Sequence, residues 1–184
     1  MKYKDLPSNV QKICDALVDG LIRILGGKLY GVYMYGAAVF PDSGPVTDID
    51  CHVILREPLN DGDREGISRL YGELAEDYPL LGSELDAWYI LLSDAREKSS
   101  PLNQLKPGMR DKSWALHCAH IRAGRYITLY GPELDNIFPI PSWEEPLRPL
   151  LKPQPIPNPR PNPRPQPLPL AHPRPLPKNL RLPI

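Results

Sequence analysis

Two aspartates separated by one residue, Asp48 and Asp50, lie in the segment DIDCHVIL, which has the apolar content of a buried strand. Because successive side chains of a strand point to opposite faces, the two carboxylates share one face, and Ile49 and Cys51 lie on the other. Magnesium prefers carboxylate oxygens and leaves room for phosphate oxygens and water. The pair therefore predicts a magnesium site that holds a phosphate-bearing substrate.

Two further features belong to this candidate site. Gly36 and Ala37 form a turn directly after a predicted strand at 29–35, and small residues there let backbone amides approach a triphosphate. Asp86 lies in a third predicted strand, SELDAWYILL, where Glu84 and Trp88 share its face. It is the candidate for a third metal ligand, or for the base that takes a proton from an attacking hydroxyl.

The elements that must position these residues alternate between helices and strands. Apolar residues recur at three- and four-residue steps from Leu6 to Ile24 and predict a helix that ends at Gly26. Strands are expected at 29–35, 48–55 and 83–92, helices at 60–78 and 111–122, and a strand or an extended arm in RYITLYGPE. This order predicts an α/β fold of the α+β kind, with a small mixed sheet flanked by helices.

The chain changes character after Glu145. Residues 1–146 contain all 22 acidic residues and 15 of the 22 basic residues, a formal charge of −7, and the rest of the chain carries +7. Proline occupies every second position from Pro153 to Pro169, which removes backbone donors and fixes φ, so an extended, solvated rod is predicted. We expect a core at 1–110, a helical and extended segment at 111–146, and a disordered proline-rich tail at 147–184.

Composition narrows the class of partner. An acidic body binds nucleic acid poorly, since affinity for a phosphate backbone comes mainly from lysine and arginine, so a small-molecule substrate is expected. The three widely spaced cysteines, Cys14, Cys51 and Cys118, fit neither a disulfide framework nor a paired thiolate site and indicate a cytoplasmic location. No stretch approaches the ~18 apolar residues of a membrane span, so no membrane contact is expected.

The stretch YGAAVFPDSGPVTDIDCHVIL has the order of a strand, a glycine with a small residue, a loop, and Asp-hydrophobic-Asp. This order resembles the signature of the nucleotidyltransferase superfamily. With ELDAWYI and ITLYGPELDNIFPIPSWEEPLRPLL, roughly residues 20–151 are similar to aminoglycoside adenylyltransferases of the streptomycin/spectinomycin type.

That resemblance implies a function and a role for each candidate residue. The implied reaction transfers AMP from ATP, bound with Mg2+, to a hydroxyl of a small polar acceptor such as an aminoglycoside, which would confer antibiotic resistance. Asp48 and Asp50 would bind the metal, and Asp86 would be the third ligand and the general base. Gly36, with Ala37, would open the phosphate-binding turn.

The sequence departs from this family in two places. Ala37 stands where the family usually has a serine whose hydroxyl contacts the phosphates. The family continues past the Trp-Glu-Glu segment into a helical acceptor-binding domain. Here a truncated remnant of that domain is expected before the proline-rich tail. A reading-frame shift would explain the change from that domain to the tail. These departures leave a second hypothesis open: a catalytically impaired binding or regulatory module, such as the partner of a toxin–antitoxin pair.

Histidines and tryptophans near the site each have a functional and a structural interpretation. His117 and His120, with Cys118 between them, can be read as zinc ligands, but no fourth ligand is evident and a helix surface with one buried thiol is favoured. Trp88 and Trp114 could stack on a base or a sugar, and packing in the core is the favoured interpretation.

Basic residues outside the core motif are also candidates for binding. Five of them could contact the triphosphate: Lys106, Arg110, Lys112, Arg122 and Arg125. The favoured alternative is that they belong to a solvated helix face. Arg110 and Lys112 are the preferred pair among them. The proline-rich tail, with Arg160, Arg164 and Arg174, is a candidate ligand for a domain that reads polyproline helices, and disorder alone is favoured over it.

Overall fold

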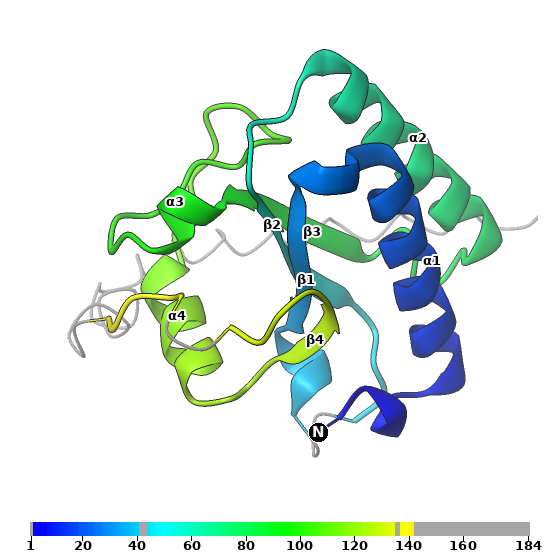
Figure 1. Cartoon of the computed structure of the whole chain (residues 1–184). Helices are drawn as coiled ribbons and strands as arrows, with labels where there is room; N and C mark the ends of the chain where they lie inside the picture. The colour runs from blue at the N-terminus through cyan, green and yellow to red at the C-terminus, as the bar shows by residue number, and fades with distance from the viewer. Residues whose placement is uncertain (1, 41–43, 135–136, 142–184) are drawn as a thin grey trace, which may run out of the picture. The chain divides into compact units, whose positions relative to one another are not determined.

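The fold is known from a computed structural model that describes residues 2–40, 44–134 and 137–141 (Figure 1). Four strands form one sheet in the order β3-β2-β1-β4, with bounds β1 Leu29–Tyr35, β2 Ile49–Leu55, β3 Leu85–Leu91 and β4 Ile127–Tyr130. Strand β1 is antiparallel to both β2 and β4, whereas β2 and β3 are parallel. This mixed sheet with flanking helices confirms the predicted α/β class.

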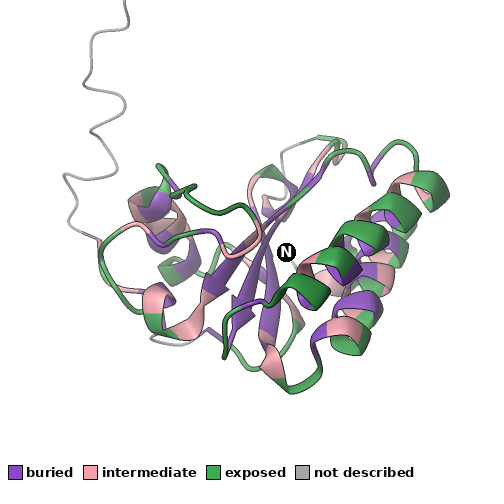
Figure 2. Ribbon diagram, turned by 90° about the horizontal axis from the view of Figure 1, so that it is seen from above, coloured by how far each residue is buried: buried purple, intermediate pink, exposed green. Residues whose placement is uncertain are grey.

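Helices cover both faces of the sheet (Figure 2). The long helices α1 (Ser8–Leu25) and α2 (Asp61–Asp77) lie together on one face, and α4 (Trp114–Arg122) lies on the other. The remaining helical segments are short: η1 Tyr3–Asp5, η2 Gly26–Lys28, η3 Ala37–Val39 and α3 Leu92–Ala95. Each face therefore has its own apolar core, with the sheet between them.

Helix α1 forms because its apolar residues fall on one stripe. The buried positions recur at three- and four-residue steps, and they include Val10, Ile13, Leu17 and Leu21. The helix ends at Gly26, whose φ of 50° belongs to the left-handed region that glycine tolerates best. The stripe packs in one core with residues of the sheet and α2, and it confirms the single apolar face that the periodicity predicted.

Helix α2 begins with a reciprocal cap. The Asn60 side chain accepts a hydrogen bond from the Asp63 amide, and the Asp63 carboxylate accepts one from the Asn60 amide, each at 2.8 Å. Lys28 Nζ donates to the same carboxylate at 2.6 Å. This ion pair connects the start of α2 to the residue that precedes β1.

Alternation along β2 determines which side chains reach each core. Ile49, Cys51, Val53 and Leu55 pack in the core under α1 and α2. Ile54 belongs to the second core, on the side of α4, and Asp50 and His52 share its face by the two-residue period. The face of the candidate site is therefore the one that α4 covers.

Helices and strands lie within a few residues of their predicted bounds, and RYITLYGPE contributes the edge strand β4. The short helix α3 was not predicted. Contacts group Met1–Leu151 as one unit and Lys152–Ile184 as another. The predicted boundaries at 110 and 146 stay predictions, and the tail at 147–184 lies outside the described residues. Within the described residues, no helix has both the length and the apolar character needed to cross a membrane.

Candidate active site

The three predicted carboxylates come from adjacent parts of the sheet. Asp48 directly precedes β2, Asp50 lies on β2, and Asp86 lies on the parallel strand β3. The Cα atoms of Asp50 and Asp86 are partners in the strand register, and neighbouring strands lie about 4.8 Å apart. Both side chains therefore rise from one face at the amino ends of their strands. Asp48 and Asp50 are half-buried, and Asp86 is exposed.

Gly36 brings the backbone of the turn after β1 against this cluster. Its φ is +78°, and a Cβ added there would lie only 2.3 Å from Asp50 Oδ2. Both the backbone conformation and the available space therefore favour glycine at this position. Ala37 follows as the first residue of η3. The turn predicted from the sequence thus lies directly beside the Asp50 carboxylate.

The electrostatics of Asp50 reflect its neighbours. Burial is the largest cause that raises the pKa of Asp50, and the negative charges of Asp48 and Asp86 raise it further, whereas His117 lowers it. Like charges close together favour a protonated form or a bound cation. The cluster is therefore a place where a positive charge lowers the free energy of the folded chain.

A lysine and a cavity lie beside Asp86. Lys106 Nζ contacts Asp86 Oδ1 at 3.0 Å, and both side chains are about half exposed, at 48% and 54%. An adjoining cavity of about 440 Å3 lies between α2, β3 and the loop that carries Lys106. Its lining includes Arg64, Ser68, Tyr71, Asp86, Leu105 and Lys106. The exposed carboxylate thus borders a largely apolar space to which Arg64 and Lys106 add positive charge.

Comparison with known proteins identifies this fold. No protein-family model and no curated protein matches the sequence. Among solved structures, the chain is similar to spectinomycin adenyltransferase AAD(9) from Enterococcus faecialis, determined with ATP and spectinomycin, with a TM-score of 0.59. The identity is 17% over 74% of this chain. This chain has the nucleotidyltransferase fold.

The similarity covers 62% of the AAD(9) chain, and at this identity it shows the nucleotidyltransferase fold alone. Two toxin–antitoxin structures are more distant. One was determined with AMP-PNP, with 19% identity over 67% of this chain and 77% of that chain and a TM-score of 0.38. The other is MntA-HepT, with 19% identity over 68% and 76% and a TM-score of 0.35. The fold assignment depends on AAD(9).

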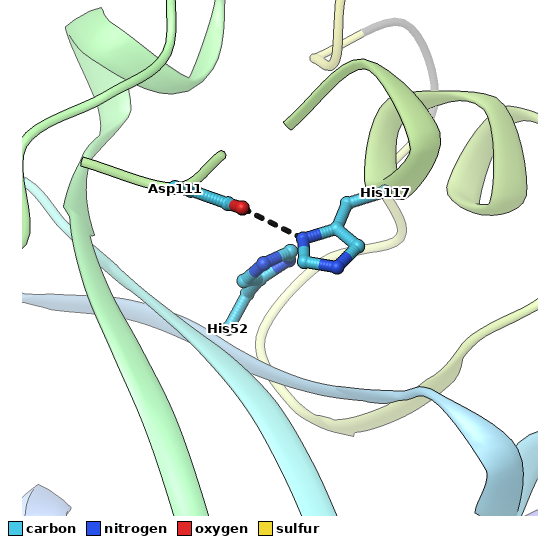
Figure 3. A group of neighbouring side chains, drawn as sticks. All are labelled: His52, Asp111 and His117. Atoms are coloured by element: carbon cyan, nitrogen blue, oxygen red, sulfur yellow. Dashed lines mark hydrogen bonds and ion pairs between the residues drawn. The ribbon is translucent and has the colours of Figure 1, made fainter. Parts of the chain in front are cut away.

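A second group of polar side chains lies on the same face of the nucleotidyltransferase sheet (Figure 3). His52 on β2 is fully buried and faces His117 on α4 and Asp111 in the loop before that helix. Burial, and then the neighbouring His117, lower the pKa of His52 well below its ordinary value, so its ring is neutral. Within the described residues, these three offer ligand atoms that all lie within 4.8 Å of one another, and the three aspartates do not.

The structure decides between the functional and the structural interpretations of the histidines and tryptophans. The set of His117, Cys118 and His120 does not gather, because Cys118 is buried in the second core and His120 packs on the Phe40 ring. His117 instead meets residues that are distant in sequence. Trp114 is 3% exposed and belongs to the second core, and Trp88 packs against it, so the packing interpretation holds for both.

Three of the five basic candidates have local partners, and Lys112 is exposed. Arg110 donates to the Ser100 carbonyl, Arg122 donates to the Phe138 carbonyl at 3.0 Å, and Arg125 lies over the Phe40 ring. The exception is Lys106, which pairs with Asp86 and lines the cavity beside it. Lys106 is therefore the basic residue of the five that the structure brings to the candidate site.

His52, Asp111 and the α2 lining of the cavity did not emerge as site residues from the sequence. His52 had a usable signal, because it follows Asp50 by two residues on the same strand face. Arg64 and Ser68 also had a signal in the sequence, since residues four apart on a helix lie side by side and can line one surface. Asp111 had none, because it lies in a loop whose path no local pattern determines.

Proposed function

We propose that this protein is a magnesium-dependent nucleotidyltransferase that transfers AMP from ATP to a hydroxyl of a small polar acceptor. The observation that carries the proposal is the approach of Gly36 to the Asp50 carboxylate, with Asp86 in register on the next strand. A turn without a side chain gives a polyphosphate access to the backbone beside a cluster of carboxylates. That combination suits the transfer of a phosphate-bearing group.

The residues present have the ligand chemistry of a divalent-cation site, and their carboxylates would turn toward the ion as it binds. Asp48, Asp50 and Asp86 supply oxygen ligands, and repulsion among their charges contributes to the raised pKa of Asp50. Lys106 already places a positive charge 3.0 Å from Asp86. Oxygen ligands are those that Mg2+ prefers, and the ion, when bound, would neutralise charge on the transferring phosphate. We propose all three aspartates as its ligands.

The proposed reaction forms one bond at the α-phosphorus of ATP and breaks another. The acceptor hydroxyl oxygen bonds to that phosphorus, the bond from it to the oxygen bridging to the β-phosphate breaks, and pyrophosphate leaves. Asp86 is the proposed base for the hydroxyl proton, since its carboxylate is exposed and borders the cavity. An exposed ion pair is worth about 0–1 kcal/mol, so Lys106 can release this carboxylate at little cost.

Space supports a small polar acceptor, such as an aminoglycoside, and the Asp86 carboxylate is the acidic group that an amino substituent would meet there, beside Arg64 and Lys106. The cavity of about 440 Å3 beside Asp86 lies within the usual range of about 300–1,000 Å3 for ligand pockets. The acceptor would thus approach the exposed base from the side that the cavity opens.

Ala37 favours a second candidate function, a nucleotide-binding module without turnover. An alanine offers no hydroxyl to a phosphate, and a lost hydrogen bond to a charged group is worth about 1.5–3 kcal/mol. Such a module would still bind ATP at the same turn and carboxylates. It would serve as a binding or regulatory partner, for example in a toxin–antitoxin pair.

Calorimetric titration of the full chain with ATP and Mg2+ tests the proposal. Asp50→Asn and Asp86→Asn should both weaken binding of ATP with Mg2+, and Asp86→Asn should in addition lower pyrophosphate release at saturating ATP by about 10²- to 10⁴-fold, the usual contribution of a general base. Asp77→Asn is the matched control, because Asp77 is an exposed aspartate at the end of α2 and does not line the cavity.

Two outcomes decide between the candidates. If wild type and Asp50→Asn bound ATP equally, the proposed nucleotide site would be wrong, and both candidate functions would be excluded. Binding that depends on Asp50, without pyrophosphate release for any aminoglycoside or nucleoside acceptor, would support the module without turnover.

A further inference from the structure

Three side chains from separate elements converge beneath the candidate active site. His52 comes from β2, Asp111 from the loop before α4, and His117 from the first turns of α4 (Figure 3). His117 Nδ1 lies 2.7 Å from Asp111 Oδ2, and all three ligand atoms lie within 4.8 Å of one another. Two imidazoles and one carboxylate are a common ligand set for zinc and related divalent ions.

His52 is the observation that points to a ligand. It is 0% exposed, and among the described residues neither Nδ1 nor Nε2 has a hydrogen-bond partner. Buried polar groups are nearly always satisfied, and one that is not costs about 1–3 kcal/mol. The hydrogen bond between Asp111 and His117 accounts for those two residues and leaves His52 unexplained.

The carboxylate of Asp111 is held in the manner of a metal ligand. Its Oδ1 accepts a hydrogen bond from the Ser113 amide at 2.8 Å, which leaves Oδ2 directed at His117. Its backbone carbonyl accepts bonds from Ser100 Oγ and the Trp114 amide. Such outer contacts fix the direction of a ligand and are typical around metal ions in proteins.

An aromatic shell encloses the cluster. The Tyr35 ring stacks on His52 with centroids 4.1 Å apart and lies 4.6 Å from the His117 ring. The Phe138 ring is stacked with the His52 ring at a centroid distance of 5.8 Å, and the Trp114 ring lies 6.0 Å from the His52 ring. An apolar shell restricts water and fixes the imidazole orientations, which strengthens binding of a cation by a preformed site.

We propose that His52, Asp111 and His117 bind one zinc-like divalent transition-metal ion, at a site distinct from the three aspartates. The two nitrogen ligands select such an ion over Mg2+, which prefers oxygen ligands alone. The ion would connect β2 to α4 and its preceding loop, and its fourth position would hold water. The bound ion would therefore hold α4 and its preceding loop against β2, the strand that carries Asp50.

Cobalt(II) provides a direct probe, because its visible absorption band is intense only in tetrahedral coordination. The full chain, freed of metal with a chelator, should bind one equivalent of Co2+ with that band, and Zn2+ should displace it. Zn2+ should also raise the midpoint of thermal unfolding, since an ion that binds the folded chain stabilises it.

Variants at the ligands identify the site. Asp111→Asn keeps an oxygen for the Ser113 amide and should fold, and His117→Asn, at a side chain that is 16% exposed, should also fold. Each should weaken Co2+ binding by about 100-fold or more, because even the loss of an outer partner costs about 10- to 100-fold. His120→Asn, on the same helix, is the matched control and should bind like wild type.

Variants at the aspartates separate the two sites. Asp48→Asn with Asp50→Asn should retain the Co2+ band, and it tests the proposed nucleotide site independently. The proposal is overturned if wild type shows no band, if the band persists in Asp111→Asn and His117→Asn, or if the aspartate double variant abolishes it. Circular dichroism of each variant shows that loss of binding occurs in a folded chain.

Discussion

Replacement of Gly36 by alanine is the sharpest perturbation of the candidate active site. The added Cβ would lie 2.3 Å from Asp50 Oδ2, and real Cβ contacts are essentially never below 3.0 Å. The carboxylate must therefore move by at least about 0.7 Å, and a misplacement of about 1 Å can cost about 10²-fold in rate. The positive φ of +78° adds about 1–3 kcal/mol of backbone strain.

Gly124→Ala separates the strain from the displacement of Asp50. Gly124 has a φ of +71°, and a Cβ there would meet nothing within 4 Å. Both variants should lose a similar unfolding free energy in urea, but Gly36→Ala alone should weaken binding of ATP with Mg2+, by about 10-fold or more, a loss of about 1.4 kcal/mol or more. Calorimetric titration measures the binding. Wild-type affinity in a folded Gly36→Ala variant would refute the reasoning.

Three further perturbations test the fold and the site. Ala37→Ser restores a hydroxyl at the turn and should tighten ATP binding by about 10-fold or more in the same titration, since such a bond is worth about 1.5–3 kcal/mol; unchanged affinity would place the phosphates elsewhere. Leu17→Ala, at a site with 0% exposure, should lower the unfolding free energy in urea by about 2–5 kcal/mol and leave ATP affinity intact. Burial raises the pKa of Asp63, but hydrogen bonds from Lys28 and the Asn60 amide and the Lys28 charge lower it more, to below its ordinary value. Its contribution to stability is therefore complete above the unfolded pKa of about 3.9 and disappears as pH falls through the folded pKa; Asp63→Asn should lose that part of the acid dependence, and an unchanged acid profile would contradict it.

Local patterns predicted the elements and the carboxylates of the site. The stripe from Val10 to Leu21 predicted α1, and apolar runs predicted β1, β2 and β3, because burial on one or both faces leaves a repeat in the sequence. The period of two predicts that Asp48 and Asp50 share one face.

Contacts between distant segments were beyond these patterns. His52 and Asp111 meet across 59 residues, and the loop that carries Asp111 has no periodicity to indicate its path. The pairing of Lys106 with Asp86 likewise depends on a loop conformation. Sequence patterns record which face of an element is buried, and they do not record which loop side chain lies over that face.

The parallel pairing of β2 with β3 has a consequence for how the site assembles. Asp50 and Asp86 come together only after the intervening chain, including α2, has folded back across the sheet, which carries the entropy cost of closing a long loop. A slip of one residue in that pairing would turn Asp86 to the opposite face. Partly folded chains would therefore lack the proposed nucleotide site, and ATP bound there would selectively stabilise molecules in which β3 has found its register.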